Sequence, residues 1–186
     1  LADNENWSRE KETMTLWELA TQAFDRLKVI RGRIEAIEHE MAVGHISTAM
    51  QDEYDRLVVE YDRAGGYTWQ AKTIRLLKGF GFPESRFHDP LKTFSGGWQM
   101  RAYFVRLLLT EPDYLLLDEP TNYLDLEGTL WLEKYLATYP YTVFMISHDR
   151  DLLNKSVNSI IHLEHRKLTF YKGNYDTFET TRRMQM

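Results

Sequence analysis

The most regular hydrophobic pattern of the chain lies in residues 16–41, where apolar residues recur at alternating intervals of four and three. The positions are Leu16, Ala20, Ala23, Leu27, Ile30, Ile34, Ile37 and Met41. Such a repeat predicts a heptad helix, with charged residues such as Arg31 and Glu35 on its other faces. A second run with the same spacing, from Met50 to Ala64, follows Gly44-His45 and ends at Gly65-Gly66. The two runs predict an antiparallel helical hairpin; two ordinary amphipathic helices packed on a core are the alternative.

Beyond the hairpin the pattern changes to helices that alternate with short apolar strands. Helices are predicted over residues 69–80, 98–110 and 126–137. Strands are predicted over 114–117, 142–146, 157–163 and 168–171, the last two joined by a polar turn. Continuously apolar strands between helices are typical of a parallel sheet covered on its faces. The closing pair predicts a small antiparallel edge, so the predicted fold class is α/β.

Composition excludes several classes of protein. The chain has 186 residues, of which 43% are hydrophobic and 27% charged, as in soluble globular proteins. It has no cysteine, which excludes a disulfide partner, a thiolate nucleophile and a Cys-based zinc site. No apolar run approaches the ~20 residues that span a bilayer, so we expect no membrane partner. The net charge of −5 argues against a dedicated nucleic-acid binder.

Two adjacent carboxylates, Asp118 and Glu119, end the apolar strand that begins at Tyr114. Ligands of open α/β sheets bind at the carboxyl ends of the strands. Asp118 is therefore placed to hold Mg²⁺, and Glu119 to orient and deprotonate an attacking water, which are the two parts that phosphoryl transfer needs. The alternative is a pair of solvated acids at a strand end.

Two further segments carry candidate chemistry. Ser95-Gly96-Gly97 precedes the helix at 98–110, where Ser95 can cap the helix and the glycines let a ligand approach its N-terminus, a site suited to phosphate. A plain serine cap after a loop is the alternative. His148 follows the strand at 142–146 and is expected near Asp118 and Glu119 if the two strands are neighbours.

In order and spacing these segments resemble ATP-binding-cassette (ABC) ATPases. Phe94-Ser95-Gly96-Gly97-Trp98 and the segment from Asp118 to Asp125 are similar to the F subfamily, whose members are soluble proteins that act on the ribosome. That subfamily also has a helical arm inserted before the signature, where residues 16–64 stand here. Gly173-Asn174-Tyr175 matches its closing strand motif.

The resemblance implies a role for each matched residue. Ser95, Gly96, Gly97 and Gln99 form the signature that contacts ATP held by an opposing cassette. Asp118 is the Walker B acid on Mg²⁺, Glu119 is the catalytic base and His148 is the switch histidine. Asp125 belongs to the loop that crosses between paired cassettes.

One motif of the family is absent from the sequence. A phosphate-cradling loop needs Gly-x-x-x-x-Gly-Lys-Ser/Thr, and none of the ten glycines is followed by Lys. Since the chain also lacks an initiator Met, we expect it to be the back part of one P-loop NTPase cassette, without the Walker A part. The expected parts are an N-terminal segment (1–15), the hairpin arm (16–66), a helical subdomain with the signature (67–110) and the Walker B, D-loop and switch-His part of the core (111–186). The sheet would then lack the strand that leads into the Walker A loop.

The predicted function is that of a cytoplasmic F-type ATPase, coupled to the ribosome or to translation. Its cofactors would be ATP and Mg²⁺. Its partners would be a second cassette, from the same parent chain or another copy, and the ribosome or tRNA through the arm. The chain by itself is not expected to hydrolyse ATP. The alternatives are a non-catalytic module whose arm contacts RNA or protein, and an ATPase subunit of a transporter or of a chromosome-maintenance or repair complex.

Overall fold

The computed structural model describes residues 13–185, which divide into two compact units. The first comprises residues up to 78 together with 82–110, and the second comprises 79–81 with 111–186. Most of the predicted N-terminal segment, residues 1–12, lies outside the described residues. Among the helices of residues 13–185, none combines the length and apolar character that a bilayer crossing requires.

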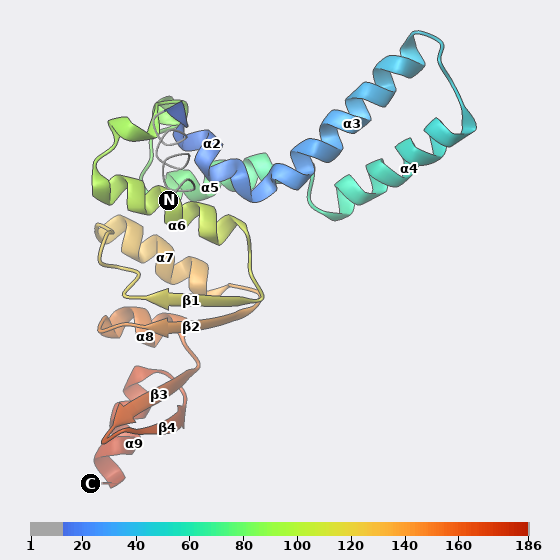
Figure 1. Ribbon diagram of the computed structural model, residues 1–186. Helices are drawn as coiled ribbons and strands as arrows, with labels where there is room; N and C mark the ends of the chain where they lie inside the picture. The colour runs from blue at the N-terminus through green and yellow to red at the C-terminus, as the bar shows by residue number, and fades with distance from the viewer. Residues whose placement is uncertain (1–12, 186) are drawn as a thin grey trace. The chain divides into compact units, whose positions relative to one another are not determined.

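The first part of the chain is helical, and the named strands, all of which lie in the second unit, alternate with the helices α7, α8 and α9 (Figure 1). The elements are α2 (Leu16–Thr21), a 3₁₀ turn (Gln22–Phe24), α3 (Asp25–Ala42), α4 (Thr48–Arg63), α5 (Trp69–Gly79), two further 3₁₀ turns (Glu84–Arg86 and Leu91–Thr93), α6 (Gly96–Leu109), β1 (Tyr114–Asp118), α7 (Leu126–Ala137), β2 (Thr142–Ile146), α8 (Arg150–Ser156), β3 (Ser159–Glu164), β4 (Lys167–Lys172) and α9 (Tyr175–Gln185).

The prediction of one continuous heptad helix over residues 16–41 is wrong at its start, because the 3₁₀ turn separates α2 from α3. The Thr21 hydroxyl donates to the carbonyl of Trp17 at 2.8 Å, a local bond that bends helices. Gln22 accepts a hydrogen bond of 2.8 Å from Arg106 of α6. Since α2 packs against α6, only α3 is left to pair with α4.

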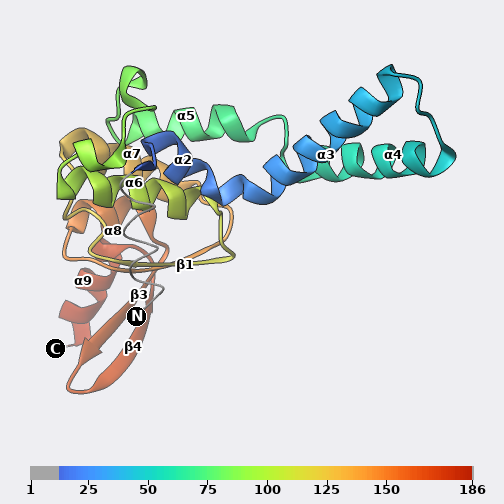
Figure 2. The same ribbon diagram turned by 45° about the horizontal axis from the view of Figure 1, so that its top comes forward.

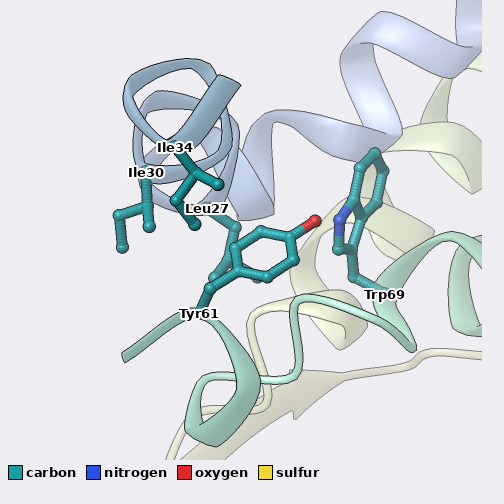
Figure 3. Packing of buried hydrophobic residues seen from close by; sticks show 5 residues of the cluster. All are labelled: Leu27, Ile30, Ile34, Tyr61 and Trp69. Carbon is teal, nitrogen blue, oxygen red and sulfur yellow. The ribbon is translucent and has the colours of Figure 1, made fainter. Parts of the chain in front are cut away.

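Helices α3 and α4 run antiparallel and side by side, as the views in Figures 1 and 2 agree. The face that α3 turns toward α4 carries the predicted heptad residues Leu27, Ile30, Ile34 and Ile37, all buried. At one end of the hairpin, Tyr61 and Trp69 join the first three of these in a hydrophobic cluster (Figure 3). The antiparallel helical hairpin predicted from the two heptad runs is confirmed, with its first helix beginning at Asp25 instead of Leu16.

Across the hairpin, Arg33 of α3 donates two hydrogen bonds to Glu53 of α4, at 2.7 and 2.8 Å. These bonds lower the pKa of the Glu53 carboxyl, with a smaller contribution from the charge of Arg33. A carboxyl whose pKa is lowered by folding stabilises the fold above its unfolded-state pKa, and this stabilisation is lost as the pH falls through the folded-state value.

We therefore expect Arg33→Met to raise the titration midpoint of Glu53 toward that of a free glutamate. Carbon NMR of the side-chain carboxyl against pH measures this midpoint. Arg63→Met, in the last turn of α4, is the matched control and should leave it unchanged. Equal midpoints in the parent chain and in Arg33→Met would show that the bidentate pair does not persist in solution.

In the second unit, β1 and β2 form a parallel two-stranded sheet in which Leu116 pairs with Phe144 and Asp118 with Ile146. Leu115 and Leu117 of β1 are buried, but the alternate residues are not: Tyr114 is 75%, Leu116 71%, Phe144 51% and Ile146 54% exposed. The prediction that helices cover both faces is therefore wrong for this sheet within residues 13–185. Each strand also has one edge without a partner strand in the described chain, as expected for a sheet that lacks a neighbouring strand.

Strands β3 and β4 form the predicted antiparallel pair, with Ser159 opposite Lys172 and Glu164 opposite Lys167. The two turn residues between them, His165 and Arg166, have φ values of 50° and 61°. Two left-handed residues in succession make a tight turn whose twist matches that of the strands. Helix α9 lies beside β4 in both views (Figures 1 and 2).

Candidate functional site

The candidate catalytic residues of the second unit lie where β1 and β2 end. The parallel register places the last residue of β1, Asp118, opposite the last residue of β2, Ile146. The Glu119 backbone N–H continues the ladder by donating to the Ile146 carbonyl at 2.8 Å. The segments that follow the two strands, with Glu119 and His148, are thus brought to one edge of the sheet. Asp118 is exposed there.

Glu119 has a backbone conformation that is rare for its residue type. Its φ is 45°, in the left-handed region, which costs free energy of order 1–3 kcal/mol for a residue with a Cβ and occurs preferentially at functional sites. Its side chain is 24% exposed. The Oε1 atom is buried and has no hydrogen-bond partner among the described residues. A buried acceptor of this kind needs a donor, such as an ordered water or the nearby imidazole of His148, whose Nε2 lies 3.5 Å away without making a hydrogen bond.

His148 lies beside Glu119, which confirms the predicted proximity of the two residues. The His148 backbone N–H donates to Glu119 Oε2 at 3.4 Å, and the distance from Nε2 to Oε1 is 3.5 Å. The His148 side chain is 96% exposed, so its imidazole can reach a ligand from solvent. The roles of base and switch histidine stay predictions, because they require a bound nucleotide.

Asp125 begins α7 and has a local structural role that the sequence analysis did not assign. Its Oδ1 accepts a hydrogen bond of 2.9 Å from the Gly128 N–H, which makes it the N-cap of the helix. Asp149 does the same for α8, where Oδ1 accepts from the Leu152 N–H at 3.1 Å. The signal for both was present in the sequence, since an Asp directly before a helical pattern is a typical cap.

The signature residues of the first unit lie at the start of α6. Ser95 is the N-cap by its backbone conformation, but its hydroxyl makes no capping bond to this helix. The prediction that Ser95 caps with its side chain is therefore wrong. A Cβ placed on Gly96 or Gly97 would meet nothing within 4 Å, so the space around the first turn is open. A helix N-terminus with open space before it fits a phosphate group.

Two side chains after the glycines are held by the fold. The Gln99 amide donates to the Phe94 carbonyl at 2.8 Å, which fixes the loop that leads into α6. The Trp98 ring meets Phe82 edge to face, with ring centroids 5.0 Å apart, and the guanidinium of Arg101 lies 4.4 Å from its centroid. Gln99 was predicted to contact ATP; in this structure its amide serves the loop instead, and a contact with nucleotide stays a prediction.

The residues at the sheet edge fit a magnesium ion that is held only in part by protein. In residues 13–185, no group of three or more His, Asp or Glu side chains is arranged to hold a metal. Mg²⁺ is usually bound by one or two carboxylates together with waters and substrate phosphates. The exposed carboxylate of Asp118 can serve as such a ligand, and the buried Glu119 Oε1 can accept from a nearby water.

The sequence profile of one family, described as ABC transporter, matches residues 4–122. The chain therefore belongs to the ABC transporter family. Its fold is similar to a solved structure titled "Structure of ATP binding subunit of ABC transporter", with a TM-score of 0.57 and 20% identity, covering 94% of this chain and 57% of that one. This likeness confirms the α/β cassette fold predicted from the sequence.

Curated relatives confirm the resemblance to the F subfamily. ABC transporter F family member 3 of Arabidopsis thaliana is 47% identical over 141 residues, which are 76% of this chain and 19% of that protein. ATP-binding cassette sub-family F member 3 of Rattus norvegicus is 40% identical over 82% of this chain and 20% of its own length. The probable ATP-binding protein YheS of Haemophilus influenzae is 44% identical over 68% of this chain, again 20% of its own length. The chain thus spans about a fifth of the length of these relatives.

Proposed function

We propose that the chain forms part of an F-type ABC ATPase that binds and hydrolyses ATP between paired cassettes. The observation that supports this most directly is the pair of Glu119 and His148 at the carboxyl ends of β1 and β2, with a separation of 3.5 Å. The open N-terminus of α6 supports the second half of the proposal, a signature that faces ATP on an opposing cassette. Coupling to the ribosome or to translation, in the cytoplasm, is what the resemblance to the F subfamily implies, and it belongs to the same proposal.

In this proposal each residue at the sheet edge has a separate task. Asp118 holds Mg²⁺, which when bound offsets the charge of the phosphates. Glu119 accepts a proton from the attacking water, for which its unpartnered Oε1 is available. His148 lies close enough to Glu119 to share in orienting that water. Asp125, as the cap of α7, holds the D-loop at the start of a rigid helix.

The division into N-terminal segment, arm, helical subdomain and core part, made from the sequence, belongs to this proposal. In it the arm is the part that contacts the ribosome or tRNA. The arm carries four cations near one end, Arg26, Lys28, Arg31 and Arg33, and each of them lies beside a carboxylate. The ion pairs join Arg26 to Glu60, Lys28 to Asp25, Arg31 to Glu35 and Arg33 to Glu53, all at 2.6 to 2.8 Å. Binding to RNA by charge alone is therefore not favoured for this cluster.

The isolated chain is expected to show no saturable ATP binding in the micromolar range and no sustained hydrolysis. The reason is that its sequence has no phosphate-cradling loop with a lysine, on which the β- and γ-phosphates depend. Calorimetric titration with Mg-ATP and release of inorganic phosphate measure the two properties. The Glu119→Gln chain is the matched control and should give the same background release. Micromolar binding together with turnover that falls in Glu119→Gln would overturn this expectation.

A further inference from the structure

The loop that carries His148 is continuous with a very short helix. His148 directly precedes Asp149, whose side chain caps α8, and α8 has seven residues. The Leu153 N–H donates to the Asp149 carbonyl at 3.1 Å, so the first turn of the helix includes the residue next to His148. A shift of α8 therefore shifts His148 relative to Glu119.

A partly buried ion pair fastens the other end of α8 to α7. Lys155 Nζ lies 2.8 Å from Glu133 Oε2 and donates a hydrogen bond to it. The Glu133 side chain is only 5% exposed, whereas that of Lys155 is 54% exposed. The hydrogen bond to Glu133 raises the pKa of Lys155. A buried carboxylate that loses its single cationic partner is left with an uncompensated charge, so α8 is held at the place where Lys155 reaches Glu133.

The residue before Lys155 fastens α8 on a second side. Asn154 donates to the Asp176 side chain of α9 at 3.0 Å and accepts from the Asp176 backbone N–H at 2.9 Å. Leu152 of the same helix is fully buried. Helix α8 is thus held by the burial of Leu152, by the contacts of Asn154 and Arg150 with α9, and by the ion pair of Lys155 with Glu133, which joins it to α7.

We propose that Lys155 is a positioning residue for the switch histidine: through its ion pair with Glu133 it fixes α8, and thereby keeps His148 beside Glu119. The pair also joins the two helices that follow the candidate site residues, since Asp125 caps α7 and the residue after His148, Asp149, caps α8. The catalytic importance of His148 in this inference rests on the proposed function. The predicted geometry, in which Lys155 holds α8 and thereby His148, does not.

The test compares variants of the 186-residue chain by NMR in the absence of nucleotide. In Lys155→Met, amide hydrogen exchange of α8 and of His148 and Asp149 is expected to rise at least about ten-fold, because local opening becomes easier. The imidazole cross-peaks of His148, assigned by their loss in His148→Gln, should shift, because the ring leaves its position 3.5 Å from Glu119 Oε1. Lys155→Arg keeps the pair and should restore both readouts to within about two-fold of the parent chain.

Two further variants keep the test decisive. Lys134→Met changes the exposed lysine next to Glu133 on α7 and should alter neither readout. Glu133→Gln removes the buried charge and is the substitute if Lys155→Met does not fold; it should raise exchange in the same segment by a smaller factor. The proposal is overturned if the exchange rates and His148 signals of Lys155→Met match those of Lys134→Met. It is also overturned if exchange in the β3–β4 hairpin of Lys155→Met rises by the same factor, because that would indicate a general loss of stability. Since no ATP is present, these outcomes do not depend on whether the proposed ATPase function is correct.

Discussion

Glu119→Gln is expected to lower ATP turnover by about 10²- to 10⁴-fold, the range usual for loss of a general base, while ATP stays bound. The measurement requires a protein in which this chain is joined to a Walker A loop. In the proposed function that loop binds the phosphates of ATP, and this sequence does not contain it. The expectation follows from the geometry of Glu119. Its Oε1 makes no hydrogen bond to the described residues, which leaves one carboxylate oxygen available for a water. Glutamine has nearly the same shape but cannot accept a proton at this position.

The matched control for this prediction is Glu127→Gln, eight residues later in the exposed first turn of α7. It makes the same chemical change outside the site and should leave turnover within about two-fold of the unmodified protein, as surface substitutions usually have small effects. Steady-state phosphate release gives turnover, and retention of labelled ATP after gel filtration gives binding. Turnover in Glu119→Gln equal to that in Glu127→Gln would refute the assignment of Glu119 as the base.

Gly66→Ala is expected to lower the free energy of unfolding by about 1–3 kcal/mol, the usual range for an overpacked core. A Cβ at this position would clash with the ring of Tyr61. That ring is 6% exposed and belongs to the hydrophobic cluster of Figure 3. The backbone has no simple escape, because the Gly66 N–H donates to the carbonyl of Tyr61 itself at 2.7 Å. The ring would have to leave its contact with Tyr67, whose centroid is 5.1 Å away.

Gly32→Ala is the opposite case in the same hairpin. Gly32 lies in the middle of α3, is exposed, and a Cβ there would meet nothing within 4 Å. Alanine in a helix interior is favoured over glycine by about 0.5–1 kcal/mol, so this variant should be more stable. Urea unfolding followed by far-UV circular dichroism measures both changes. Shifts of the same sign for the two variants would contradict the packing of Tyr61 against Gly66.

The boundaries of the arm show where local pattern and tertiary contact disagree. The heptad positions from Leu27 onward predicted the helix and its buried face, because α3 pairs with a helix of the same periodicity. Leu16 and Ala20 follow the same spacing but belong to α2, which packs against α6. The spacing cannot distinguish the two cases. A 3.5-residue repeat shows that one face of the helix is apolar, but it does not show which helix covers that face. The hydrogen bonds of Thr21 and Gln22 lie at the break between α2 and α3.

At the candidate site, the sequence by itself determined the residue types and their order. An apolar strand that ends in Asp118-Glu119 and a second strand that ends before His148 are local features, and parallel pairing of neighbouring strands was enough to predict that Glu119 and His148 meet. The resemblance to ABC ATPases rested on the same short segments and on the motif at Ser95, and the family and its relatives confirm it.

The tertiary structure decided what depends on contacts between residues far apart in the chain. It exposed Leu116 and Phe144 on a sheet that the sequence pattern predicted to be covered. It also revealed the ion pair of Glu133 and Lys155, which lie 22 residues apart with no common motif. Periodicity and capping signals are set by neighbours within a few positions, so the sequence determined the elements. Side-chain partners are chosen by packing between elements, so only the fold could determine them.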